Sequence, residues 1–178
     1  RPLIFNNNDR PGIMLSTAVK KYADYYGIIC GKNTLFFTNN DTAYESAISL
    51  HKKGINVGSI IDIREKPDSE IVKESESLGI KIYSSHTVVD TKGYKKLKEI
   101  SIMRLSKNGD TIVGEKINIP CDCLAMSGGW TPAVHLFTQS GGKLKFREED
   151  KVFIPNVHTS KQISVGSCNG DFELDEII

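Results

Sequence analysis

A short apolar segment that runs without a spacer into a helical pattern most limits how this chain can fold. The strand-forming residues Thr34–Phe37 are followed directly by the polar residues 38–42. A helical pattern then covers residues 42–53, and Gly54 can end that helix. The nearly continuous apolar run at residues 57–63 is typical of a buried parallel strand. This order of strand, tight turn, helix and strand predicts a βαβ unit.

The rest of the chain extends this unit and then changes character. A second helix and a third strand continue the βαβ alternation, and three segments separated by turn residues then predict an antiparallel meander. The fold class predicted is a three-layer α/β, Rossmann-like domain with a parallel sheet and an antiparallel β-meander. The predicted helices cover residues 14–26, 42–53 and 69–78, and the predicted strands cover residues 34–37, 57–63, 80–83, 87–90, 97–105, 115–119, 123–126, 152–154 and 163–165.

Composition narrows the function classes. The chain has 178 residues and a formal net charge of +1, which gives no reason to expect nucleic acid or an anionic membrane as a partner. No apolar run approaches the roughly 20 residues that span a bilayer. The four cysteines form no C-x-x-C pair, so we predict structural thiols, no metal site and a reducing, cytoplasmic compartment.

The turn after the first strand is the candidate pyrophosphate site. Dinucleotide folds bind pyrophosphate at a helix N-terminus, where free N–H groups and the helix dipole favour anions. The glycine positions of that turn are taken here by Thr38 and Asn40, and the next small residue is Ala43. Two readings stay open: a turn that binds nucleotide through residues Thr38, Asn39, Asn40, Asp41 and Thr42, or a turn that keeps only the shape. In the second reading Asp41 caps the helix.

Two further positions complete the candidate site. Asp62 follows Ala43 by 19 residues and ends the second strand, where an acid accepts hydrogen bonds from a ribose and favours NAD over NADP. The alternative is a strand-end acid that pairs with Arg64. Gly128 and Gly129 follow the returning strand and are predicted to face the nicotinamide, the alternative being a plain Gly–Pro turn.

These residues together resemble the nicotinamide-nucleotide domain of the two-dinucleotide-domain flavoprotein reductases, in which that domain is inserted into a split FAD domain. A closer resemblance is to the α subunits of heterotetrameric sarcosine oxidases. The residues that carry it are Arg1–Phe5, Asn8–Leu15, Phe37–Asp41, Ser127–Pro132, Val134–Phe137, Gln139–Ser140, Gly142–Leu144 and Cys168–Gly170.

The resemblance implies a domain organisation and an activity. Residues 1–30 would be a flanking segment of an outer dinucleotide domain, residues 31–132 the NAD-type domain, and residues 133–178 the return segment. The parent enzyme would oxidise sarcosine to glycine and formaldehyde while O2 is reduced to H2O2. In that family the flavins and the amine-oxidising site lie mainly on or beside the β subunit, and NAD is associated with the α subunit. Ser167 stands where the FAD reductases have an Asp, so FAD is not expected here.

Two hypotheses follow for the chain itself. It is either an NAD-binding domain or a degenerate Rossmann-like scaffold without nucleotide that contacts neighbouring domains and partner subunits. The first predicts an open polar cleft at residues 38–42. The second predicts exposed apolar residues at Ile4–Phe5 and Ile177–Ile178. We expect a segment of a longer polypeptide in either case, with no catalytic residue of its own.

Overall fold

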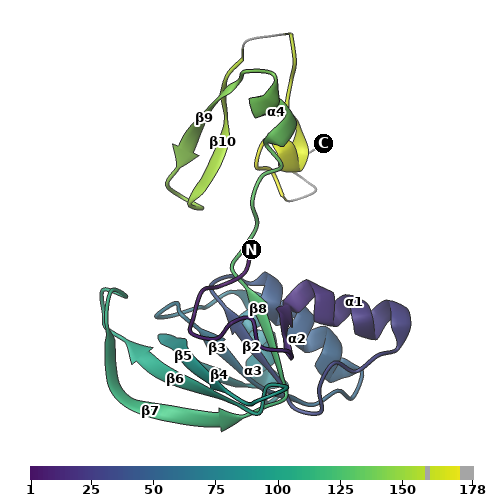
Figure 1. Cartoon of the computed structure of the whole chain (residues 1–178), viewed down its shortest axis with the longest axis vertical. Helices are drawn as coiled ribbons and strands as arrows, with labels where there is room; N and C mark the ends of the chain where they lie inside the picture. The colour runs from purple at the N-terminus through teal and green to yellow at the C-terminus, as the bar shows by residue number, and fades with distance from the viewer. Residues whose placement is uncertain (159–160, 173–178) are drawn as a thin grey trace. The chain divides into compact units, whose positions relative to one another are not determined.

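The computed structural model describes residues 1–158 and 161–172 (Figure 1). The chain divides into two compact units, the first comprising Arg1–Gly129 and the second beginning at Trp130. Strands β1 to β8 and helices α1 to α3 belong to the first unit. In the part of the chain that the structure describes, no helix is both long enough and apolar enough to cross a bilayer.

The first unit is built on a five-stranded parallel sheet in the order β1-β8-β2-β3-β4 (Figure 1). Its central strands are almost entirely buried because side chains cover both faces. The sheet strands are β1 (Ile13–Leu15), β2 (Thr34–Thr38), β3 (Val57–Asp62), β4 (Lys81–Tyr83) and β8 (Cys123–Ser127).

Helices cover one face of this sheet, and an antiparallel three-stranded sheet covers the other. Successive side chains of β2 point to opposite faces of the sheet and so belong to two separate core clusters. Phe36 packs with helix residues, whereas Leu35 and Phe37 pack with residues of the second sheet. The predicted three-layer α/β fold is therefore confirmed. The covering elements are α1 (Ser16–Tyr26), α2 (Thr42–Lys52) and α3 (Glu70–Ser77), and β5 (His86–Lys92), β6 (Glu99–Leu105) and β7 (Ile112–Pro120).

The first helix differs from its prediction. It begins at Ser16, because residues 13–15 form the edge strand β1, which pairs with β8. Tyr22 and Tyr26 follow Val19 at helical spacing, yet they are 41% and 62% exposed. Helix α1 lies over the edge of the sheet, so only a narrow face that includes the buried Val19 reaches the core.

The second unit is small and has its own secondary structure. It contains an antiparallel hairpin and a short helix, of which only part of the second strand was predicted. The strand predicted at residues 163–165 was wrong, because these residues have no regular structure. The elements are α4 (His135–Gln139), β9 (Lys143–Arg147), β10 (Val152–Val157) and the 3₁₀ turn η1 (Gly166–Cys168). The assignment of residues 1–30 and 133–178 to an outer domain stays a prediction.

Asp122 joins the start of β8 to the start of β2. Its carboxylate accepts the backbone N–H groups of Lys32 and Asn33 at 3.0 and 2.8 Å. Burial opposes the charge, but these hydrogen bonds outweigh it and hold the pKa of Asp122 below its ordinary value.

We expect Asp122→Asn to lower the free energy of unfolding by about 1–2 kcal/mol at pH 7, because hydrogen bonds to a charged acceptor are stronger than those to an amide. A lowered pKa in the folded state means that this stability is present above the unfolded-state pKa, roughly pH 4, and is lost as the pH falls through the folded-state pKa. Urea unfolding of both proteins between pH 3 and pH 7 measures the difference. A gap that is constant with pH would contradict this account, and the exposed change Glu76→Gln is the matched control.

Candidate functional site

The predicted site residues meet at one edge of the parallel sheet. In register, Thr38 at the end of β2 lies opposite Asp62 of β3 on one side and Ser127 of β8 on the other. Parallel strands end at the same edge, which is where ligands bind in open α/β sheets. The fold therefore brings together the turn at residues 38–42, the acid and the two glycines Gly128 and Gly129.

The turn uses its own N–H groups internally. The N–H of Asn39 donates to the carbonyl of Ser127 at 3.4 Å, and the N–H of Asn40 donates to the Thr38 hydroxyl at 3.1 Å. The N–H of Thr42 donates to Oδ1 of Asn40 at 3.1 Å. Three of the backbone donors that were predicted to receive pyrophosphate are thus already bonded within the protein.

The side chain of Asn40 holds the turn closed. Its Nδ2 donates to the Ser127 carbonyl at 3.0 Å and lies 3.1 Å from the Ser127 hydroxyl oxygen. Because Asn40 Oδ1 also receives the Thr42 N–H, Asn40 does the work of a helix cap. The alternative that Asp41 caps the helix is wrong, since Asp41 has helical dihedral angles and makes no cap hydrogen bond. Asp41 instead forms an ion pair with Arg64 at 2.7 Å.

Asp62 is fully buried and fully bonded. Tyr44 donates its hydroxyl hydrogen to Oδ2 at 2.8 Å, and the backbone N–H of Arg64 donates to Oδ1 at 2.9 Å. The guanidinium of Arg64 adds a contact of 2.7 Å from Nη2 to Oδ2 and contacts of 3.1 Å from Nε to both oxygens. A carboxylate offers about four acceptor positions, so none remains for a ribose hydroxyl. The structure thus contains the Asp62–Arg64 pair that the sequence left as an alternative.

The charges of this cluster are strongly fixed. Burial and the neighbouring Asp62 carboxylate raise the pKa of Tyr44, so its hydroxyl stays a neutral donor. Burial opposes the charge of Arg64, but the bonds to Asp62 and Asp41 outweigh it and raise the pKa of Arg64. One cation is therefore shared by two carboxylates beside the phosphate turn, which leaves a net charge of −1 on these three side chains.

The two glycines are in contact with the first residues of the chain. The Gly128 N–H donates to the carbonyl of Arg1 at 2.7 Å. A Cβ at Gly128 would lie 3.0 Å from the carbonyl oxygens of Arg1 and Pro2, and Gly129 has φ +81°. Close packing within the chain thus accounts for Gly128, and a left-handed backbone accounts for Gly129.

A dinucleotide does not fit this arrangement as it stands. Its pyrophosphate would have to displace Asn40 from Ser127, and its ribose would have to displace Arg64 or Tyr44 from Asp62. Sequence reasoning missed Tyr44 and Ser127. Tyr44 lies in the first turn of α2 and Ser127 ends β8, so both are close to the site along the chain. Neither position belongs to a dinucleotide-binding sequence pattern.

The cysteines form no second site among the described residues. All four are free, and no group of three or more potential metal-ligating side chains gathers in residues 1–158 and 161–172. Burial raises the pKa values of Cys121 and Cys123 to about 12, so both thiols are protonated at neutral pH.

Comparison with known proteins identifies relatives over almost the entire chain. No protein-family model matches. The α subunit of sarcosine oxidase from Corynebacterium sp. (strain P-1) is 34% identical over 173 residues, which is 97% of this chain and 18% of that protein. The α subunit from Rhizobium meliloti (strain 1021) is 34% identical over 154 residues, 86% of this chain and 14% of that protein. The chain thus spans less than a fifth of the length of these relatives.

Solved structures agree on the fold. Thioredoxin reductase of T. acidophilum superposes with a TM-score of 0.62 at 18% identity, over 96% of this chain and 58% of the reductase. The oxidoreductase FprA of Mycobacterium tuberculosis superposes with a TM-score of 0.61 at 12% identity, over 96% of this chain and 56% of FprA. The chain has the fold of the FAD/NAD(P)-binding oxidoreductases, and over nearly its whole length it is homologous to one segment of the sarcosine oxidase α subunits.

Proposed function

We propose that this chain is the Rossmann-like domain of a sarcosine oxidase-type α subunit and that it serves there as a scaffold whose own nucleotide site is closed. The observation that carries the proposal is the state of Asp62, whose buried carboxylate is bonded to Tyr44 and Arg64 instead of facing solvent. The hydrogen bonds of the Asn40 side chain to Ser127 and Thr42 also support a closed site.

The parent would be an oxidoreductase that converts sarcosine to glycine and formaldehyde with O2 as the acceptor, giving H2O2. This activity rests on homology to the named α subunits, of which the chain covers less than a fifth. The domain would contribute no catalytic residue. Its partners would be the remainder of the α chain and the other subunits of a heterotetramer, in the cytoplasm.

Exposed apolar side chains support a scaffold role. Ile4 is 92% exposed, and Tyr25 and Ile29 are 80% and 61% exposed on and just after α1. Phe5, which was predicted to be exposed with Ile4, instead packs edge-on against Phe37, with the two ring centroids 5.7 Å apart. Ile177 and Ile178 lie outside the described residues.

NAD binding is the second candidate function. What favours it is the register that places the turn, Asp62 and Gly128 at one sheet edge, where the fold of the reductases receives a dinucleotide. The N–H groups of residues 39–42 would then hold the pyrophosphate and Asp62 the ribose, with Gly128 and Gly129 beside the nicotinamide. NAD, which lacks the 2′-phosphate, would be preferred over NADP, and FAD would not bind here.

Calorimetric titration separates the two functions. We expect the wild-type chain to give no binding heat with NAD or NADP at millimolar concentration. The change Asn40→Gly should give weak but measurable binding, because it removes the side chain that blocks phosphate approach and frees the Thr42 N–H. The exposed change Glu76→Gln, which leaves every hydrogen bond of the turn in place, is the control and should still give none.

Micromolar binding of NAD by the wild-type chain, with weaker binding of NADP, would overturn the scaffold proposal. The second candidate would then require Asp62→Asn to weaken that binding by about tenfold, the loss of one good hydrogen bond to a charged group. Circular dichroism of each variant excludes loss of the fold as the cause.

A further inference from the structure

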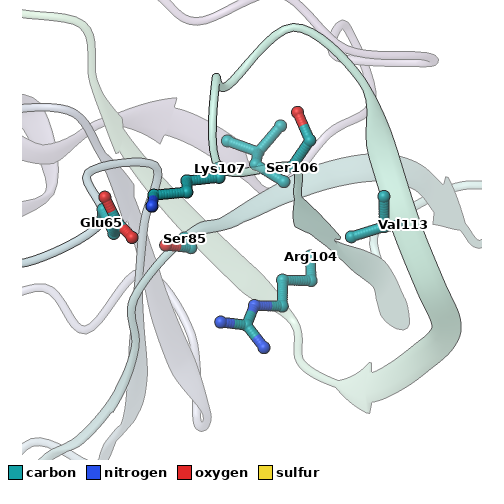
Figure 2. Close-up of a pocket in the computed structure, with 7 residues that line it drawn as sticks. Glu65, Ser85, Arg104, Ser106, Lys107 and Val113 are labelled. Atoms are coloured by element: carbon teal, nitrogen blue, oxygen red, sulfur yellow. The ribbon is translucent and has the colours of Figure 1, made fainter.

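A hollow with charged side chains at its rim lies apart from the phosphate turn, where the segment between β4 and β5 meets the hairpin of β6 and β7 (Figure 2). Its volume is about 380 Å³, which is within the range of small-molecule sites. None of the residues at 38–42 lines it. The residues that the argument uses are Glu65, Ser85, Arg104, Leu105, Lys107 and Val113.

Hydrogen bonds of the backbone hold Ser85 in place at this hollow. Ser85 is 8% exposed, and its backbone has a left-handed φ of +55°, an uncommon conformation for a residue other than glycine. Its N–H donates to the carbonyl of Arg64 at 2.9 Å, and its carbonyl accepts the N–H of Leu105 at 2.6 Å. The backbone of Ser85 is thus held between the loop that follows β3 and the end of β6. Ser85 lines the hollow, and its hydroxyl has no hydrogen-bond partner among the described residues.

Two cationic side chains also line the hollow. Figure 2 shows the ammonium end of Lys107 directed toward the carboxylate of Glu65, and Arg104 extending from β6 on the other side of Ser85. Neither Arg104 nor Lys107 forms an ion pair with any residue that the structure describes. The three charged side chains leave one excess positive charge in the hollow, so a monoanion neutralises it.

We propose that this hollow binds small organic carboxylates. A guanidinium presents parallel N–H donors that match a carboxylate, so Arg104 would bind the two oxygens, and the free hydroxyl of Ser85 would donate a further hydrogen bond. Leu105 and Val113 supply apolar surface for the remainder of the ligand. A phosphate dianion is disfavoured because Glu65 would repel its second charge.

Titration of the 178-residue chain with sodium butyrate, followed by ¹H–¹⁵N NMR, tests the proposal. We expect saturable shifts of the Ser85, Arg104 and Leu105 amides at millimolar ligand. Arg104→Gln should weaken binding by at least about tenfold, and Ser85→Ala by several-fold, because each removes a hydrogen bond to a charged group. Lys73→Gln on the exposed face of α3 removes the same charge elsewhere and should leave the affinity unchanged.

Sodium phosphate and sodium chloride at matched ionic strength are the comparison anions. Phosphate that binds these amides more tightly than butyrate would overturn the choice of ligand class, and shifts that never saturate would overturn the site itself. Equal losses of affinity in Arg104→Gln and Lys73→Gln would show that the net charge of the chain, and not a contact with Arg104, causes the binding, and would overturn the proposal. Unchanged amide spectra away from the hollow show that each variant is folded. The test does not depend on whether the phosphate turn binds nucleotide.

Discussion

Replacing Arg64 by methionine is expected to lower the free energy of unfolding by about 3 kcal/mol, because it leaves a buried carboxylate without its cation. Asp62 is 0% exposed and would keep only the Tyr44 hydroxyl and one backbone N–H. Asp41 would lose its ion pair as well. Urea denaturation at pH 7, monitored by circular dichroism, measures the change.

Two controls separate this effect from a general loss of surface charge. Lys52→Met removes an exposed ion pair to Glu74 in the same unit, and we expect it to cost less than about 1 kcal/mol. The double change Asp62→Asn with Arg64→Met should regain much of the lost stability, because no unpaired charge then remains buried. If Arg64→Met alone costs no more than Lys52→Met, the cluster does not hold Asp62 as described.

Replacing Phe36 by alanine is expected to be at least as damaging, with a loss of about 3–5 kcal/mol. Phe36 is 0% exposed in the central strand β2, and it packs with α2 residues such as Ala47 and Leu50 beneath the helix. Ile60 of β3 and Ala125 of β8 lie beside Phe36 on the two neighbouring strands. Strand pairing holds both residues in place, so they cannot move in to fill the cavity. Urea denaturation of the 178-residue chain again gives the magnitude.

A volume-conserving change provides the comparison for Phe36. Phe36→Leu should cost roughly 1 kcal/mol, because most of the buried apolar surface is kept. Ile4→Ala, at a position that is 92% exposed, should cost no more than about 0.5 kcal/mol. Equal losses for Phe36→Ala and Phe36→Leu would show that the packing at β2 is looser than the structure describes.

In open α/β sheets, ligands bind at the carboxyl ends of the strands, which is where Asp62, Arg64 and Asn40 lie. In this chain these residues bond to the protein itself, so they are expected to contribute to stability instead. A chain whose site residues stabilise the fold can persist as a scaffold within a larger subunit, which is the role we propose.

The order of elements in the first unit was predictable because local periodicity reports it. Continuous apolar runs at β2, β3 and β8 identified buried parallel strands, and the alternation of strand and helix predicted the layers. The exposure of Tyr22 and Tyr26 on α1 could not be predicted, because their spacing is helical whether or not a partner surface lies opposite. Prediction from the sequence also missed the short strands β1 and β9, whose few residues carry little periodic signal.

The sequence by itself determined that the turn at residues 38–42, Asp62 and Gly128 end at one sheet edge, because parallel strands in a βαβ order share that edge. Only the tertiary structure decided what these residues bond. Asn40 meets Ser127 across 87 positions of the chain, and Ser85 meets Leu105 across the base of a hairpin. Such bonds depend on side-chain positions in the packed fold, which local residue patterns do not encode.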